Sequence, residues 1–385
     1  MFWQWTRRVI LMAVLAILVV GFLNREQLLR LWSVNSLFSE DRIVANFSHM
    51  DTMFLTTPLP RGAGPVSTLP KGKDMTLPDD AESWIRDRAL TSLLVMKDGQ
   101  IRYENYFLDT GPQDLRISWS LAKSYLSALF GVLVSEGAIA SLDDPVTRYA
   151  PSLTGSAYDG ASIRNVLNMA SGVTFDEDYL DYNSDINRMG RVIALGGRLD
   201  DFAASLHERF TEPGTEWQYV SIDTHVIGMV IRGATGRPVP ELLVEKIIAP
   251  LGMEQPGYYL TDGAGVAFVL GGLNLTTRDY ARFGQMVAQK GDYGGQQVVP
   301  ADWLAESIAP SAPTEPGHIG YGYQWWIPVG AHEGEVLGRG IYGQYIYIDQ
   351  SRDVVIVVTA ADLGFREPGV NDANIEMMRR IAGRL

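Results

Sequence analysis

Segments with the patterns of β-strands lie toward both ends of the chain. Residues Leu90 to Met96 are almost all apolar, Asp98-Gly99 is a strong two-residue turn signal, and residues Gln100 to Phe107 alternate. Together they predict a β-hairpin. Three later segments are rich in aromatic and β-branched residues, which favours strands; they are Tyr321–Ile327, Gln344–Ile348 and Val354–Thr359.

Helical patterns dominate the region between these strands. The segment from Leu121 to Glu136 is apolar almost all round, which predicts a buried helix that ends at Gly137. Further helical patterns occupy Ile163–Met169, Thr224–Ala234, Pro240–Ile248 and Thr277–Lys290, and Asn374–Leu385 predicts a closing helix. We expect an α/β (α+β) fold, in which strands from both ends form one antiparallel sheet flanked by helices. The residues from about 140 to 290 would form an inserted helical lobe, with a cleft between lobe and sheet.

The N-terminus begins with a basic pair and an apolar run. Arg7 and Arg8 precede 15 unbroken apolar residues, Val9 to Leu23. A bilayer needs ~20 residues, but flanking Trp5 and a thin bilayer can make up the difference. A cleaved signal peptide and a buried core helix are the alternatives. No small-x-small cleavage site follows, which favours an uncleaved anchor.

The anchor sets the predicted organisation of the chain. The basic pair would stay in the cytoplasm, so the body would lie on the outer, periplasmic side of the cell membrane. We predict an anchor and juxtamembrane segment over residues 1–35 and a single domain over residues 36–385. Four prolines and three glycines between residues 58 and 72 predict that residues 24–80 are an extended connector without a long helix.

Composition excludes several kinds of protein. The formal net charge of −13 argues against nucleic acid as a partner, because phosphate binding needs a basic face. The absence of cysteine excludes disulfides, thiolate nucleophiles and cysteine metal sites. The five histidines are scattered without metal-ligand spacing, so we expect no metal and no other cofactor.

The strongest candidate for chemistry is Ser120, with Lys123 three residues later at the start of the predicted buried helix. Residues i and i+3 share a helix face, so the lysine amine can reach the serine hydroxyl. A serine needs a base to become a nucleophile, and a lysine becomes one when burial lowers its pKa. The structural alternative makes Ser120 an N-cap and Lys123 a surface residue. Ser-x-x-Lys occurs once in the chain, which has six lysines.

Two further segments carry candidate residues. Tyr219, in Trp217–Thr224, could exchange protons with a leaving group if a positive neighbour lowered its pKa. The glycine-rich stretch from Gly338 to Tyr345 suggests close approach of a strand to a ligand. Each segment is a weak signal alone, since a packed tyrosine or a simple turn would have the same sequence.

In order along the chain, these pieces resemble the serine beta-lactamase and penicillin-binding-protein family. The similarity is greatest to the branch with class C beta-lactamases, esterases and 6-aminohexanoate-oligomer hydrolases. Further matching segments are Ile163–Val173, Glu177-Asp178-Tyr179, Pro213-Gly214-Thr215, Pro250–Met253, Gly320–Trp326 and Gly343–Tyr347. The resemblance runs from about Leu37 to the C-terminus. It implies a beta-lactamase-like fold.

The resemblance also implies roles for single residues. Ser120 would be the acylated nucleophile, Lys123 its base partner and Tyr219 the second proton carrier. The oxyanion hole would use the N–H groups of Ser120 and Gln344. The Gln344 assignment assumes that Ile341-Tyr342-Gly343 aligns with the family's Lys-Thr-Gly triad, and it could slip by a residue.

Two departures from the family pattern affect the substrate. Ser221 stands where the Tyr-x-Asn element has its amide, and Ile341-Tyr342 lacks the cation that binds a β-lactam or peptide carboxylate. A site without that cation should bind penicillins and terminal D-alanine poorly, so we expect hydrolysis of a small ester or amide through an acyl-serine. Tyr342 and Gly343 would line the site with Ser221. The alternatives are a D-alanyl peptidase or beta-lactamase, and a catalytically silent envelope-binding protein.

Overall fold

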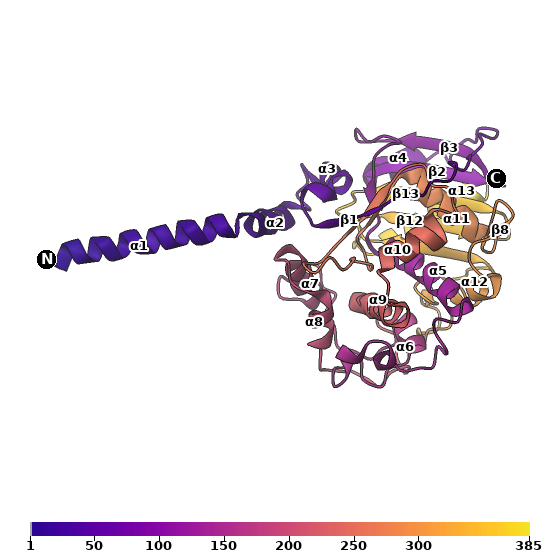
Figure 1. Ribbon diagram of the computed structural model, residues 1–385. Helices are drawn as coiled ribbons and strands as arrows, with labels where there is room; N and C mark the ends of the chain where they lie inside the picture. The colour runs from indigo at the N-terminus through magenta and orange to yellow at the C-terminus, as the bar shows by residue number, and fades with distance from the viewer. Residues whose placement is uncertain (1) are drawn as a thin grey trace.

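The computed structural model describes residues 2–385, and a seven-stranded antiparallel sheet forms its centre (Figure 1). The strand order is β3-β2-β13-β12-β11-β10-β9. The bounds are β2 Leu90–Lys97, β3 Gln100–Tyr106, β9 Gly320–Tyr321, β10 Trp326–Ile327, β11 Glu335–Gly340, β12 Gln344–Asp349 and β13 Val354–Ala360. Strand β2 pairs with β13, so strands from both ends of the chain meet, as the sequence predicts.

Alternating side chains give this sheet two buried faces. Leu94, Ile346 and Val355 lie on the face that packs with helices α5 (Ala122–Ser135) and α11 (Thr277–Ala288). Their neighbours Leu93, Tyr345 and Ile356 belong to a second cluster with α4 (Ala81–Asp87) and α13 (Val370–Ala382). The sheet is therefore covered on both sides, and α5 is held in the core.

A helical lobe lies beside the sheet (Figure 1). It contains α6 (Ile163–Leu167), α7 (Asp185–Ala194), α8 (Leu199–Ala204) and α9 (Ser221–Thr235). A four-stranded sheet follows the order β1-β5-β6-β4, with bounds Thr56–Leu59, Gly257–Leu260, Leu273–Leu275 and Arg116–Ile117. The other elements are α10 (Val239–Leu243), a π-helical turn (Val244–Ile248), a hairpin β7–β8 (Asp292–Tyr293, Gln296–Gln297), α12 (Ala301–Ser307) and short 3₁₀ turns.

Several elements differ from the sequence expectation. Strand β11, the four-stranded sheet and helices α7 and α8 were not predicted. The segment Tyr321–Ile327 forms two short strands around a turn, in which Gln324 has a φ of 68°. Helix α11, expected in the lobe, packs against the central sheet. The closing helix begins at Val370, earlier than expected.

Three helices precede the first strand: α1 (Phe2–Leu23), α2 (Arg25–Ser36) and α3 (Ile43–Ser48). The prediction of an extended connector from residue 24 is therefore wrong over α2, which precedes the prolines. Figure 1 shows α1 projecting away from the body. Its 21-residue stretch from Trp3 has a mean hydropathy of 2.2 and none of it is buried, so a core helix is excluded. It is long and apolar enough to span a membrane or to be a signal sequence.

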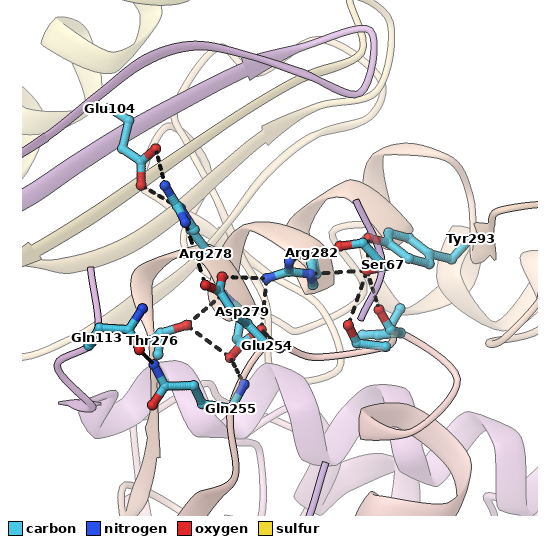
Figure 2. A network of polar contacts seen from close by, with 12 residues as sticks. Ser67, Glu104, Gln113, Glu254, Gln255, Thr276, Arg278, Asp279, Arg282 and Tyr293 are labelled. Atoms are coloured by element: carbon cyan, nitrogen blue, oxygen red, sulfur yellow. Dashed lines mark hydrogen bonds and ion pairs between the residues drawn. The ribbon is translucent and has the colours of Figure 1, made fainter. Parts of the chain in front are cut away.

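The proline-rich connector is fixed to the central sheet by the polar network in Figure 2. Arg282 on α11 donates to the Ser67 carbonyl oxygen at 2.8 Å and to Asp279 at 2.9 Å. Arg278 forms two hydrogen bonds with Glu104 on β3, at 2.7 and 3.0 Å. Arg282 and Asp279 are both buried, so each compensates the charge of the other, which would be costly to bury alone.

Candidate active site

Ser120 lies in a 3₁₀ turn, Trp119–Leu121, that leads directly into α5. The first N–H groups of such a helix have no partner within it. Trp119 has a φ of 45°, a strained conformation for a tryptophan. Gly340 of β11 lies so close that a Cβ on it would collide with the Ser118 carbonyl oxygen. The end of β11 and the start of α5 therefore meet at Ser120.

Lys123 reaches Ser120 from one turn along the helix. Its Nζ lies 3.3 Å from the Ser120 Oγ and donates to the Leu270 carbonyl oxygen at 2.8 Å. Only 2% of the lysine is exposed, and burial lowers its pKa from 10.5 to about 7. The negative charges of Glu177 and Asp223 oppose this shift. At neutral pH a large fraction of the amine is therefore unprotonated and able to accept a proton.

Tyr219 lies beside both Lys123 and Ser120. Its ring centroid lies 5.5 Å from the Lys123 Nζ, and the ring stacks on Trp326 at 5.1 Å. Burial, and then the charge of Glu177, raise its pKa well above the usual value. The expectation of a lowered pKa for Tyr219 is therefore wrong, because desolvation outweighs its positive neighbours. The phenol stays protonated at neutral pH and can donate a proton.

Glu177 is a site residue for which no role was predicted from the sequence. It accepts a hydrogen bond from the Ser221 backbone N–H and another from the Tyr179 hydroxyl at 3.0 Å. Burial raises its pKa, and the charge of Lys123 opposes that shift. Glu177 is one of 45 acidic residues, and no local pattern separates a buried carboxylate from the exposed ones. Only the family resemblance draws attention to the segment that contains Glu177.

Two clefts of different character meet at Ser120. One has a volume of about 340 Å³, and Glu177, Tyr219, Arg339 and Arg366 are among its lining residues. The other has a volume of about 120 Å³ and an almost entirely apolar lining that includes residues of α7. Ser120, Tyr179 and Ile341 line both clefts. A carbonyl group at Ser120 could therefore have a polar group on one side and an apolar group on the other.

Three residues predicted to line the site are placed elsewhere. Gln344 is buried, and its side-chain amide donates to the carbonyl oxygens of Ile341, Tyr342 and Ala360. The ring of Tyr342 is buried under the turn and stacks on Phe38 at 4.7 Å. Gly343 has a φ of 86° and completes the turn between β11 and β12. None of these three lines either cleft at Ser120.

The remaining binding residue, Ser221, begins α9 and lines the apolar cleft. The expected absence of a cation is wrong. Arg339, two residues before Ile341, lines the polar cleft and lies 4.5 Å above the Trp326 ring. Arg366 lines the same cleft and pairs with Asp178 at 2.9 Å. The assumed alignment of the triad is displaced, because β11 ends at Gly340 and Ile341 is the residue beside Ser120.

Metal chemistry has no candidate site within residues 2–385, where no group of three or more His, Asp or Glu side chains is placed to hold an ion. The groups that surround Ser120 are an amine, a phenol, the Glu177 carboxyl group, the Arg339 guanidinium and main-chain N–H groups.

Comparison with known proteins shows which family this chain belongs to. The sequence profile of the beta-lactamase family matches residues 82–376. The 6-aminohexanoate-dimer hydrolase of Paenarthrobacter ureafaciens is 32% identical over 292 residues, which cover 72% of this chain and 74% of that protein. Esterase EstB of Burkholderia gladioli is 34% identical over 140 residues, about a third of each chain (33% and 34%).

Solved structures share the fold. One from Bacillus anthracis, provisionally assigned as a 6-aminohexanoate-dimer hydrolase, has a TM-score of 0.79 at 23% identity and covers 90% of this chain and 95% of its own. The hydrolase EstCE1 has a TM-score of 0.60 at 17% identity and covers 78% of this chain and 96% of its own. The fold and the site define a serine hydrolase acting on esters or amides. The chain belongs to the beta-lactamase family.

Proposed function

We propose that Ser120 is the nucleophile of this hydrolase, Lys123 its general base and Tyr219 the acid that protonates the leaving group. The observation that carries the proposal is the buried amine of Lys123, 3.3 Å from the Ser120 hydroxyl and with a pKa lowered to about 7. Burial that removes the charge of a lysine costs free energy, and a lysine with a purely structural role has no need of a neutral amine. The same observation argues against a catalytically silent binding protein.

The proposed acylation moves one proton through three side chains. The neutral amine of Lys123 takes the hydroxyl proton as the Ser120 Oγ bonds to the carbonyl carbon of the substrate. The Tyr219 phenol gives its proton to the leaving oxygen or nitrogen as that bond breaks, and Lys123 returns a proton to the phenolate. Water then attacks the acyl-serine by the reverse route, which releases the acid and restores Ser120.

The oxyanion of this reaction needs two N–H donors. Ser120 supplies one at the start of α5. We assign the second to Ile341, in place of Gln344, because Ile341 follows β11 directly and lines both clefts at Ser120. This backbone group has no side-chain chemistry, so a change of residue at 341 should alter fit more than rate.

The substrate in this proposal is a small ester or amide. The relatives named as a 6-aminohexanoate-dimer hydrolase and as an esterase support it. A specific observation also favours a second candidate, a D-alanyl peptidase or beta-lactamase: Arg339 and Arg366 in the polar cleft could bind a carboxylate. We place the catalytic body outside the cytoplasm, held by α1 in the cell membrane with Arg7 and Arg8 inside.

The test is steady-state hydrolysis by the full-length protein in detergent. Wild type should turn over p-nitrophenyl butanoate with a kcat/KM far above that for benzylpenicillin, and Ser120→Ala should turn over neither. Ser127→Ala is the matched control, because Ser127 lies on the same helix and its hydroxyl has no hydrogen-bond partner among residues 2–385. Equal kcat/KM values for ester and penicillin would favour the second candidate. Full activity of folded Ser120→Ala would refute the assignment of the nucleophile.

A further inference from the structure

One wall of the apolar cleft at Ser120 comes from a part of the chain that precedes the catalytic segments. Val34, Leu37 and Phe38, on and directly after α2, line it together with Ile186, Met189 and Ile193 of α7. No lining residue carries a charge. An apolar pocket of this kind favours hydrocarbon over an ionic group.

Helix α2 is held firmly against the lobe. Arg30 donates from its Nε to the carbonyl oxygen of Ala194, the last residue of α7, at 3.1 Å. Phe38 continues the contact by packing on Trp119, the neighbour of Ser120, with ring centroids 5.8 Å apart. These two contacts hold α2 and the residues after it against α7 and the turn that carries Ser120.

The same helix has a second, unused face. Leu28, Leu29 and Trp32 are exposed by 52%, 62% and 60%. Only Asn24 separates α2 from the apolar helix α1. The helix that contributes Val34 to the pocket therefore follows directly on the proposed anchor. The exposed face of α2, formed by Leu28, Leu29 and Trp32, does not line the pocket.

The position of Tyr219 decides which part of a substrate each cleft receives. The group that protonates the leaving atom must lie on the side of the leaving group. Tyr219 lines the polar cleft and does not line the apolar one. The leaving alcohol or amine therefore lies in the polar cleft, and the acyl chain lies in the apolar pocket.

We propose that the end of α2 and the residues directly after it form a specificity element of the enzyme, and that Val34, Leu37 and Phe38 select substrates with an unbranched apolar acyl chain of about four to six carbons. This inference rests on the proposed function. The size follows from the volume of about 120 Å³, somewhat below the ~150 Å³ of a cavity that holds benzene. Each methylene that enters such a pocket should raise kcat/KM by about fourfold.

The experiment compares two tryptophan substitutions on one helix of the full-length protein. Val34→Trp fills the pocket, whereas Leu29→Trp adds the same bulk to the exposed face. With p-nitrophenyl esters from acetate to octanoate, wild type and Leu29→Trp should show kcat/KM rising to about hexanoate. Val34→Trp should lose the rise, so that its kcat/KM for the hexanoate ester falls roughly tenfold or more below that of wild type. Ile193→Trp, which fills the pocket from α7, should reproduce this pattern.

A second series holds the acyl group constant and varies the alcohol, as in ethyl, butyl and hexyl acetate. In Val34→Trp and Ile193→Trp, kcat/KM should depend on the length of the alcohol as it does in wild type. A change confined to the alcohol series would overturn the inference, and so would an unchanged acyl profile in both pocket variants. Labelling of Ser120 by a fluorophosphonate and hydrolysis of the acetate ester test the proposed function separately. Neither assay requires an acyl chain that fills the apolar pocket.

Discussion

Substitution of Lys123 by methionine should remove activity and, at the same time, change how stability depends on pH. The pKa of Lys123 is lowered from 10.5 to about 7. At pH 7 roughly half of the amine is therefore neutral, against roughly one in three thousand for an ordinary lysine. Loss of this base should lower kcat/KM for an ester by about 10²–10⁴-fold. It should also abolish the rise of wild-type kcat/KM up to about pH 7.

The stability of the same variant follows from proton linkage. In the unfolded chain Lys123 keeps its proton up to about pH 10.5, but in the folded protein it releases the proton near pH 7. Below pH 7 the folded state therefore carries the full penalty of a buried charge, and the penalty falls as pH rises. Wild-type stability should gain up to about 1.4 kcal/mol for each pH unit relative to Lys123→Met, or about 2 kcal/mol between pH 7 and 9.

The assay is urea unfolding in detergent, followed by tryptophan fluorescence, at pH 7, 8 and 9, with ester hydrolysis on the same samples. Lys246→Met is the matched control, because Lys246 is a surface lysine paired with Glu136 at 2.7 Å and its pKa is raised. The control should retain full activity and lose no more than about 1 kcal/mol. Parallel pH profiles of stability for wild type and Lys123→Met would refute the lowered pKa. Near-wild-type hydrolysis by Lys123→Met would refute its part in the reaction.

Four further outcomes follow from the structure. Glu177→Gln removes a negative charge that raises the pKa of Lys123, so the midpoint of the kcat/KM profile should move to lower pH; an unmoved or alkaline-shifted midpoint would contradict this. Tyr219→Phe should lower turnover about 10²–10⁴-fold without a change in circular dichroism, and a fully active variant would remove the tyrosine from the mechanism. Arg282→Met leaves Asp279 buried without its cation and should cost about 3–5 kcal/mol in urea unfolding; a loss below 1 kcal/mol would show the network of Figure 2 to be dispensable. A reporter fused after Leu385 should be active only if it works outside the cytoplasm, and activity of a cytoplasm-dependent reporter would reverse the topology.

The central sheet could be predicted because its strands carry their own signals. Asp98-Gly99 marks the first hairpin, and the last strands are long runs of β-branched residues. Strand β11 was not predicted because Glu335–Gly340 contains two glycines and two charged residues, Glu335 and Arg339, which obscure a strand pattern. The four-stranded sheet escaped because its strands have two to four residues, too few for a period to appear.

The site could be predicted where one helix turn carries the chemistry. Ser120 and Lys123 are three residues apart, so local geometry alone brings them together. Glu177 and Arg339 come from a loop of the lobe and from an unpredicted strand, and only the tertiary fold brings them to Ser120. The alignment of the triad places Gln344 at Ser120, but β11 ends at Gly340 and Ile341 lines both clefts, and the sequence does not show where β11 ends.

The pKa of Tyr219 shows the limit of reasoning from neighbours in a sequence. Its expected positive neighbour is present, since Lys123 lies 5.5 Å from its ring. That lysine is itself only about half charged at pH 7, and the burial of the phenol among aromatic rings dominates. Desolvation depends on the packed structure, so its size could not be read from the sequence.

Covalent labelling tests the central claim most directly. The full-length protein should be treated with a fluorophosphonate in detergent and analysed by intact-mass and peptide mass spectrometry, beside Ser120→Ala and the control Ser127→Ala. One adduct should appear on the peptide that contains Ser120, in wild type and in the control, and it should be absent from Ser120→Ala. An adduct on any other serine, or undiminished labelling of Ser120→Ala, would contradict the assignment of Ser120 as the nucleophile.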